Sequence, residues 1–195
     1  MSWTRRRVLQ AGGTLAGGIL AGVSGTVSAE SGEAPRSREA AGSGAGTSKR
    51  IALQNIHTSE KVDLEFYRGD GYVPDALTSI QKVLRDWRNN DQHPIDPKLM
   101  DYLYDVAHTI DVAPVFSVIS GYRSPQTNAQ LHERSSGVAS HSLHMEGRAI
   151  DVRLAGVNCA DLAQHALGMQ RGGVGYYRQS DFVHLDTGRF RTWKG

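Results

Sequence analysis

The sequence contains a single cysteine, Cys159, among its 195 residues, and this scarcity excludes an intrachain disulfide framework. Cys159 lies in a helical pattern, where we expect it to be a small buried apolar residue. A nucleophilic cysteine needs a base and an activating environment, and none lies near Cys159 in the sequence. The fold must therefore depend on a hydrophobic core, and the length suffices for one domain with such a core.

The chain also lacks a large excess of charge of either sign. Its formal net charge is +2, from 22 Lys and Arg residues and 20 Asp and Glu residues. Three of the basic residues, Arg5, Arg6 and Arg7, lie in the first 29 residues, which contain no acidic residue. Without this segment, 19 of the 22 basic residues remain against 20 acidic ones, a net charge of −1. Nucleic acid is therefore not an expected partner, because the electrostatic support for it is missing.

A strongly apolar run is missing from the N-terminal region. Residues 4–10 resemble a twin-arginine export motif, and an uncharged stretch leads from there to small residues that suit a signal peptidase at 27–29. A membrane anchor is the alternative for this length, but six glycines make the stretch weakly apolar. We predict a twin-arginine signal peptide at 1–29 and a flexible Gly/Ser/Ala tether at 30–49. The mature protein is then exported, periplasmic or facing the cell wall, without stable membrane insertion.

The folded domain is predicted to span residues 50–195 and to mix helices with short strands. Apolar and polar alternation predicts strands, and apolar stripes behind Asp-Pro or Pro-Asp pairs predict helix starts. The expected strands are 51–56, 61–67, 114–119, 148–154, 174–177 and 182–186, and the expected helices begin at 74, 96, 125 and 158. Because the order shows no regular βαβ alternation, we expect an α+β fold with a small, mainly antiparallel sheet.

Two histidines and one aspartate are placed where they can converge on one metal ion. His144 and Asp151 are seven positions apart, and Gly147 between them permits a loop to bend back as a strand. Strand alternation points Asp151 away from the apolar set of its own strand, and His184 lies on a second strand. Two neutral imidazoles and a carboxylate are a common ligand set for zinc. Three protein ligands leave a fourth position open, which is typical of a catalytic site.

Three motifs in fixed order carry a resemblance to a known family. They are S-G-Y-R-S at 120–124, S-x-H and then, after six intervening residues, Asp at 142–151, and D-x-x-H at 181–184. Together they resemble the zinc D-alanyl-D-alanine peptidase superfamily, which shares its fold with the hedgehog signalling domain, and within it the murein endopeptidase K (YcbK-like) proteins. The resemblance runs from about residue 50 to 195. It implies a hedgehog/D-Ala-D-Ala-peptidase-like fold and a zinc metallopeptidase with one Zn²⁺ ion. Its expected reaction is hydrolysis of stem-peptide cross-links in peptidoglycan by metal-activated water.

The resemblance also implies roles for single residues. His144, Asp151 and His184 match the zinc ligands, and Asp181 matches the general base. Strict alternation puts Asp181 on the face opposite His184, so a bulge or a strand start after Asp181 must redirect it. Arg123 matches an arginine that faces the substrate carbonyl or carboxylate, a catalytic and substrate-binding role. From the residues alone, an ordinary surface arginine would be the simpler interpretation of Arg123.

Three neighbouring residues have weaker assignments. Ser142 can hydrogen-bond a ligand or the substrate, or make only a local turn bond. Asp186 can orient a histidine by a hydrogen bond to its outer nitrogen, or can only solvate the end of its strand. His141 is interpreted as flanking, because a fourth protein ligand would close the site. One departure is Phe182, which stands where some relatives have a second His or a Trp.

Two other functions remain open from the sequence. A D,D-carboxypeptidase or dipeptidase would use the same metal chemistry but needs a closed pocket for a free chain terminus. A zinc-stabilised cell-wall-binding module without catalysis is the rival of another class, and the retention of Asp181 and Arg123 argues against it. We expect a monomer whose partner is the stem peptide of peptidoglycan.

Overall fold

The computed structural model describes residues 46–134 and 138–195. The predicted signal peptide at 1–29 and most of the predicted tether at 30–49 lie outside these residues. The first elements in chain order are β1 (Thr47–Asn55), β2 (Lys61–Gly69), β3 (Gly71–Tyr72), α1 (Pro74–Val83), α2 (Pro97–Thr109) and β4 (Val115–Ser120). They are followed by α3 (Pro125–Arg134), the 3-10 helix η1 (Leu143–Glu146), β5 (Ala149–Leu154), α4 (Cys159–Met169), β6 (Gly173–Tyr177), β7 (Phe182–Asp186) and β8 (Arg191–Lys194).

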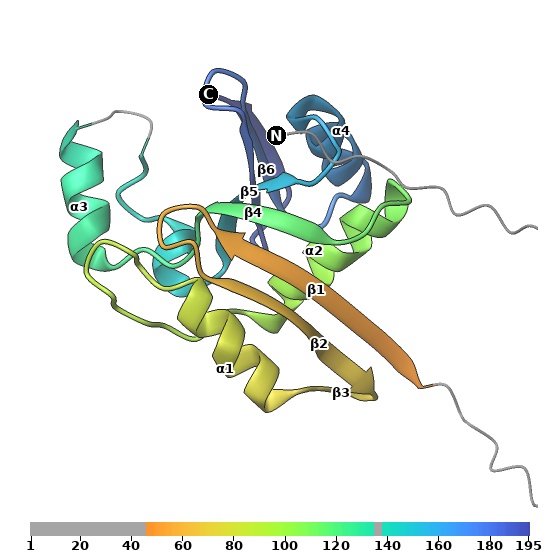
Figure 1. Cartoon of the computed structure of the whole chain (residues 1–195). Coiled ribbons are helices and arrows are strands. Elements are labelled where there is room, and N and C mark those ends of the chain that lie inside the picture. The colour runs from red at the N-terminus through yellow and green to blue at the C-terminus, as the bar shows by residue number, and fades with distance from the viewer. Residues whose placement is uncertain (1–45, 135–137) are drawn as a thin grey trace, which may run out of the picture. The chain divides into compact units, whose positions relative to one another are not determined.

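The strands of the described residues form one eight-stranded sheet in the order β3-β2-β1-β4-β5-β7-β6-β8. Figure 1 shows β1 between β2 and β4. This sheet corrects the expectation of a small, mainly antiparallel one, because β1 pairs parallel to β4 and β6 pairs parallel to β8. The strands expected at 51–56 and 61–67, and those expected at 174–177 and 182–186, are present and form the antiparallel hairpins β1–β2 and β6–β7. The α+β class is confirmed, and the sheet is mixed.

Two helices begin where side chains satisfy free backbone donors. The carboxylate of Asp96 accepts from Lys98 N at 3.0 Å ahead of Pro97, the first residue of α2. Asn158 accepts from Asp161 N at 2.9 Å and begins α4 in the same way. These caps set where the helices start, and therefore which of their faces lie over the sheet.

The core lies between the sheet and helices α1, α2 and α4, each of which contacts strands. On β5, Ile150, Val152 and Leu154 are buried in this core, and Val183 and Leu185 of β7 join them. Alternation then directs the intervening residues of β5 and β7 to the other face of the sheet. The polar site is built on that face. Among the helices of residues 46–134 and 138–195, none has the length and apolarity needed to cross a membrane.

Candidate metal centre and active-site cleft

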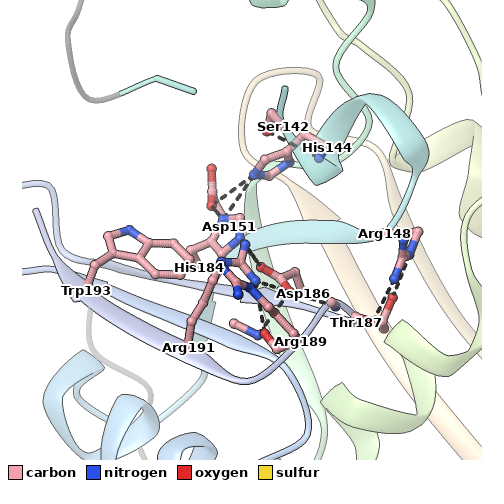
Figure 2. Close-up of polar contacts among 12 residues, drawn as sticks. Ser142, His144, Arg148, Asp151, His184, Asp186, Thr187, Arg189, Arg191 and Trp193 are labelled. Atoms are coloured by element: carbon pink, nitrogen blue, oxygen red, sulfur yellow. Dashed lines mark hydrogen bonds and ion pairs between the residues drawn. The ribbon is translucent and has the colours of Figure 1, made fainter. Parts of the chain in front are cut away.

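Three ligand-type side chains meet on the face of the sheet that is opposite the core. Asp151 on β5 and His184 on β7 are direct cross-strand partners, and His144 reaches them from η1 (Figure 2). Each of the three is buried, and each offers one ligand atom within 4.8 Å of the other two. The structure therefore brings together the three residues that the sequence predicted as metal ligands.

The ring of His144 is oriented by a single backbone carbonyl. The η1 helix begins at Ser142, whose hydroxyl accepts from His144 N at 3.4 Å, and ends at Gly147, whose φ of 64° favours glycine. Nδ1 of His144 lies 2.7 Å from Gly121 O, and it must donate there because a carbonyl only accepts. Nε2 of His144 is therefore the free acceptor. It lies 3.3 Å from Asp151 Oδ1.

The ring of His184 is oriented through its opposite nitrogen. Nε2 of His184 lies 3.0 Å from Asp186 Oδ2, so it donates to this carboxylate and Nδ1 faces the other two ligand residues. Asp186 is fully buried, and it also accepts from the backbone N–H groups of Gly173 and Gly188 at 2.9 and 2.8 Å. Arg191 donates to both carboxylate oxygens, at 3.1 and 2.7 Å. Asp186 thus lies where the sequence predicted a residue that orients a histidine.

The distances between the inward ligand atoms fit one ion. Nδ1 of His184 lies 2.9 Å from Asp151 Oδ1 and 3.2 Å from Nε2 of His144. Ligand atoms bound to one tetrahedral ion at about 2.0–2.2 Å are separated by roughly 3.3–3.6 Å. Shifts of a few tenths of an ångström convert the observed arrangement into a three-ligand site, so the donor set fits a divalent cation.

Burial and mutual contact set the protonation of the three residues. Burial lowers the pKa of His144, which favours the neutral imidazole that a metal requires. Burial opposes the charge of Asp151, but contacts with the two histidines outweigh it and hold the pKa of this carboxyl well below its usual range. Burial also opposes the charge of His184, but hydrogen bonds with Asp151 and Asp186 outweigh it and raise its pKa. A proton and a cation therefore compete for Nδ1 of His184.

Arg123 lies beside the ligands with few strong partners. Its side chain is buried, and its Nη2 lies 3.9 Å from Asp151 Oδ2. The hydrogen bonds to Asn128 Oδ1 and Ser120 Oγ are long, at 3.4 and 3.5 Å, and Nε has no partner among the described residues. Burial lowers the pKa of this guanidinium, yet an arginine remains charged at neutral pH. A guanidinium in this state can donate hydrogen bonds to an anionic or carbonyl oxygen of a ligand.

The backbone around Arg123 is held by a buried carboxylate that the sequence analysis did not single out. Asp86, which is fully buried, accepts from Ser124 N and from Ser124 Oγ, each at 3.0 Å. Arg123 N itself donates to His144 O at 3.1 Å. The Arg123 segment and η1 are thereby tied together. Asp86 follows the apolar stripe of α1. An acidic residue at such a place is usually interpreted as facing solvent, so the sequence gave little sign that Asp86 is buried.

The three ligands lie in a cleft of about 500 Å³. Its lining consists of Arg123, Val138, Ala139, His141, Ser142, Leu143, His144, Asp151, Tyr177, Ser180, Phe182, His184, Arg191 and Trp193. Ser142 and His141 therefore lie at the cleft. Ser142 also makes the local bond to His144 N that the sequence left open as its alternative role. The sequence analysis gave no role to Tyr177, Arg191 or Trp193. R-T-W-K at 191–194 has a single apolar residue, so apolar and polar alternation gave no signal for the further strand there.

Asp181 is not brought to the ligands in this structure. Its backbone has a φ of 51°, in a turn just before β7, and its side chain is 68% exposed. Arg153 Nε donates to Asp181 O at 2.5 Å and to Oδ2 at 3.2 Å. Asp181 also affects Cys159: burial and a hydrogen bond with Asp181 raise the pKa of the Cys159 thiol to about 11. The strand does start after Asp181, but this start leaves the carboxylate outside the cleft lining.

The cleft with its two histidines and one aspartate is compatible with a metallopeptidase, and comparisons with known proteins place the chain in the D-alanyl-D-alanine peptidase superfamily. A family model described as peptidoglycan L,D-endopeptidase MepK matches residues 43–193. Peptidoglycan L,D-endopeptidase MepK of Escherichia coli (strain K12) is 42% identical over 143 residues, which cover 73% of this chain and 79% of that protein. A probable peptidoglycan L,D-endopeptidase MepK of Haemophilus influenzae is 40% identical over 146 residues, 74% of this chain and 78% of that protein.

The chain therefore belongs to the MepK family of murein endopeptidases. This confirms the resemblance that the three sequence motifs carried.

Proposed function

We propose that this protein is a zinc-dependent murein endopeptidase that hydrolyses an amide bond in the stem-peptide cross-links of peptidoglycan. The observation that carries the proposal is the orientation of two histidine rings by groups behind them, which leaves one nitrogen of each facing Asp151. Three inward donors in a cleft, with space for a fourth position, are typical of a hydrolytic zinc site. The relatives are named L,D-endopeptidases, which supports an L,D bond as the one cleaved.

The ligand residues and Arg123 have separate tasks in this proposal. A bound zinc ion supplies Lewis acidity and lowers the pKa of a water molecule toward neutrality. His144, Asp151 and His184 hold the ion, and Asp186 and Gly121 O keep the two rings in the correct tautomers. The guanidinium of Arg123 binds the carbonyl oxygen or a nearby carboxylate of the substrate and stabilises negative charge that develops there.

Two residues are candidates for the group that accepts the proton and passes it to the leaving amine. Asp181 has the spacing of the family's general base, but its carboxylate is bonded to Arg153 outside the cleft. His141 lines the cleft, and histidine is the side chain that most often acts as a general base in enzymes. We favour His141 on this geometry, because a general base must come within hydrogen-bonding reach of the proton it takes.

The remaining sequence predictions are proposals about the whole chain. We propose a twin-arginine signal peptide at 1–29, then a tether from residue 30, then a peptidase domain. The last three residues of the tether predicted at 30–49 belong to β1, which begins at Thr47. The domain is proposed to have a hedgehog/D-Ala-D-Ala-peptidase-like fold and to act as a monomer. Periplasmic or wall-facing action fits relatives that are named for a peptidoglycan substrate.

The test is digestion of defined wall material by the zinc-loaded protein. The full chain is incubated with intact peptidoglycan and with soluble cross-linked muropeptides, and the products are resolved by liquid chromatography and mass spectrometry. We expect loss of cross-linked dimers, a matching gain of monomers, and product masses that name an L,D bond. The matched control is Asp151→Asn, which removes one ligand charge with little change of shape.

Each outcome assigns the protein to one class. Loss of a terminal D-alanine alone would make it a carboxypeptidase. Binding to peptidoglycan with zinc present and no product would make it a binding module. An unchanged digest with Asp151→Asn would contradict the metal site itself.

A further inference from the structure

A straight row of residues crosses four strands at the metal centre. The register pairs Asp151 with His184, His184 with Gly175, and Gly175 with Trp193. Residues paired in this way have side chains on the same face of the sheet. Arg123 extends the row beyond Asp151, at 3.9 Å. The row therefore has a cationic end at Arg123, the metal ligands in its middle, and an aromatic end at Trp193.

Gly175 allows the aromatic end to approach the ligands. A Cβ atom at Gly175 would lie 2.5 Å from Cε2 and 2.6 Å from Nε1 of Trp193, closer than real side chains come. The indole thus occupies the space that a side chain on β6 would fill. Its ring centre lies 5.1 Å from that of His184 (Figure 2). A tryptophan from the edge strand β8 thereby reaches a ligand two strands away.

Neighbouring side chains fix the indole in this position. Nε1 of Trp193 donates to the hydroxyl of Tyr177 at 3.0 Å. The ring of Tyr177 stacks on that of Phe182, with ring centres 4.5 Å apart and planes inclined by 16°. The guanidinium of Arg191 lies 5.0 Å from the indole centre while it is paired with Asp186. All three aromatic residues line the cleft, so together they form a preorganised aromatic wall.

We infer that Trp193 is a specificity-determining residue, and that the aromatic wall binds the aliphatic side chain of the residue whose amide bond is cleaved. This inference rests on the proposed function. The scissile bond must lie at the ligands, and consecutive residues of a peptide are about 3.8 Å apart. The group that contacts Trp193 therefore belongs to the residue at the scissile bond. The wall offers ring surface without a free charge, which suits methylene and methyl groups, while the cationic end suits a carboxylate.

The test separates substrate contact from support of the metal. Trp193→Ala and Trp193→Phe are compared with wild type in the full, zinc-loaded chain, with soluble cross-linked muropeptides as substrate. We expect Trp193→Ala to raise KM about tenfold or more with kcat changed less than about threefold, and Trp193→Phe to recover most of the loss. Bound zinc, measured by plasma mass spectrometry, is expected to stay at one ion per chain. Thr192→Ala, an exposed neighbour on the same strand, is the matched control and should behave as wild type.

The role of Gly175 gives a second, independent test. Gly175→Ala is expected to lower kcat/KM by displacing the indole, and to have no further effect once Trp193 has been replaced by alanine. Additive losses would show that Gly175 acts without Trp193 and would contradict the inference. Loss of zinc from Trp193→Ala would show that Trp193 only supports His184, and it would contradict the inference. A wild-type kcat/KM in Trp193→Ala would also overturn the inference and leave the endopeptidase proposal intact.

A binding measurement keeps the two proposals apart. Tryptophan emission is titrated with the same muropeptides in wild type and in Trp193→Phe. We expect a change that only the wild type shows. If the wild type shows this change but releases no product, the aromatic wall stands and the endopeptidase proposal fails. If product forms but the change in tryptophan emission is the same in both proteins, the proposal of the aromatic wall is contradicted and the endopeptidase proposal stands.

Discussion

The molecule has a second pocket that is nearly as large as the cleft but differs from it in how its charges are paired. This second pocket, of about 450 Å³, is lined by Lys49, Lys98, Asp101, Tyr102, Asp105, Arg171 and Thr187. In it, Lys49 Nζ lies 2.6 Å from Asp101 Oδ1, and Arg171 Nη1 lies 2.6 Å from Asp105 Oδ2. In the cleft, by contrast, the ligand atoms face one another and Arg123 is held by long contacts. The two pockets are thus similar in volume but differ in their charges. The second pocket contains close ion pairs, whereas the cleft contains inward-facing ligand-type atoms and an arginine with only long contacts.

The largest effect is expected from removing a ligand from the cleft. His144→Ala takes away one of three inward donors, so zinc binding and release of muropeptide monomers should both fall to background. Plasma mass spectrometry and chromatography of the digests measure the two. Treating the wild type with a chelator should give the same loss, and added zinc should reverse it. Full activity after complete removal of the metal would mean that the cleft uses another chemistry.

The next largest effect should separate the two pockets directly. Arg123→Ala is expected to lower kcat/KM by about 10²–10³-fold at unchanged zinc content, since removal of one donor to a developing oxyanion has this size of effect. Lys49→Met removes a cation from the second pocket and should leave kcat/KM unchanged. Because Lys49 and Asp101 are partly exposed, this change should lower the free energy of unfolding by no more than about 1 kcal/mol. Equal losses of activity in both variants would remove the distinction between the pockets.

Replacing Asp186, which accepts a hydrogen bond from His184, should have a smaller effect, and this effect should be on the affinity for zinc. Asp186→Asn keeps the shape of the side chain but weakens the hydrogen bond that sets the tautomer of His184. We expect the affinity for zinc to fall about 10–100-fold, measured by competition with a chromogenic chelator. Glu146→Gln alters an exposed carboxylate near the ligands and serves as control. An unchanged affinity would show that the charge of Asp186 is not needed to hold the His184 ring in its metal-binding tautomer.

The smallest effect is expected at Asp181. The carboxylate points away from the cleft, so Asp181→Asn should change kcat by less than about threefold, whereas His141→Ala should lower it by about 10²–10⁴-fold. Initial rates with muropeptides across pH 5–9 measure both variants. The reverse order of effects would restore Asp181 as the general base and would require a rearrangement of the turn before β7.

Local patterns in the sequence were enough to predict that His144, Asp151 and His184 come together. Alternation on the strand at 149–154 separates Asp151 from Ile150 and Val152, and the structure places these residues on opposite faces as expected. The hairpin turns and the cap of α2 were also predictable, because each depends on a few neighbouring residues. Such features need no knowledge of distant parts of the chain.

Features that depend on distant pairing were not predictable in the same way. The parallel pairs β1–β4 and β6–β8 join strands that other elements separate, so no short pattern encodes them. Trp193 was missed for this reason, because its place beside His184 depends on the pairing of β8 with β6. Asp181 shows the limit of a motif: its spacing matches the family's base, but one residue with φ of 51° turns its carboxylate toward Arg153.

The direct pairing of Asp151 with His184 restricts where insertions and deletions can occur in the chain. A shift of one residue between β5 and β7 would turn His184 to the core face and bring Val183 or Leu185 to Asp151. Single-residue insertions inside either strand should therefore be eliminated by selection, whereas insertions in the loop from Thr58 to Glu60, on another part of the sheet, should be tolerated. Across the family, variation in length should thus concentrate away from these two strands, even where the amino acids around them differ.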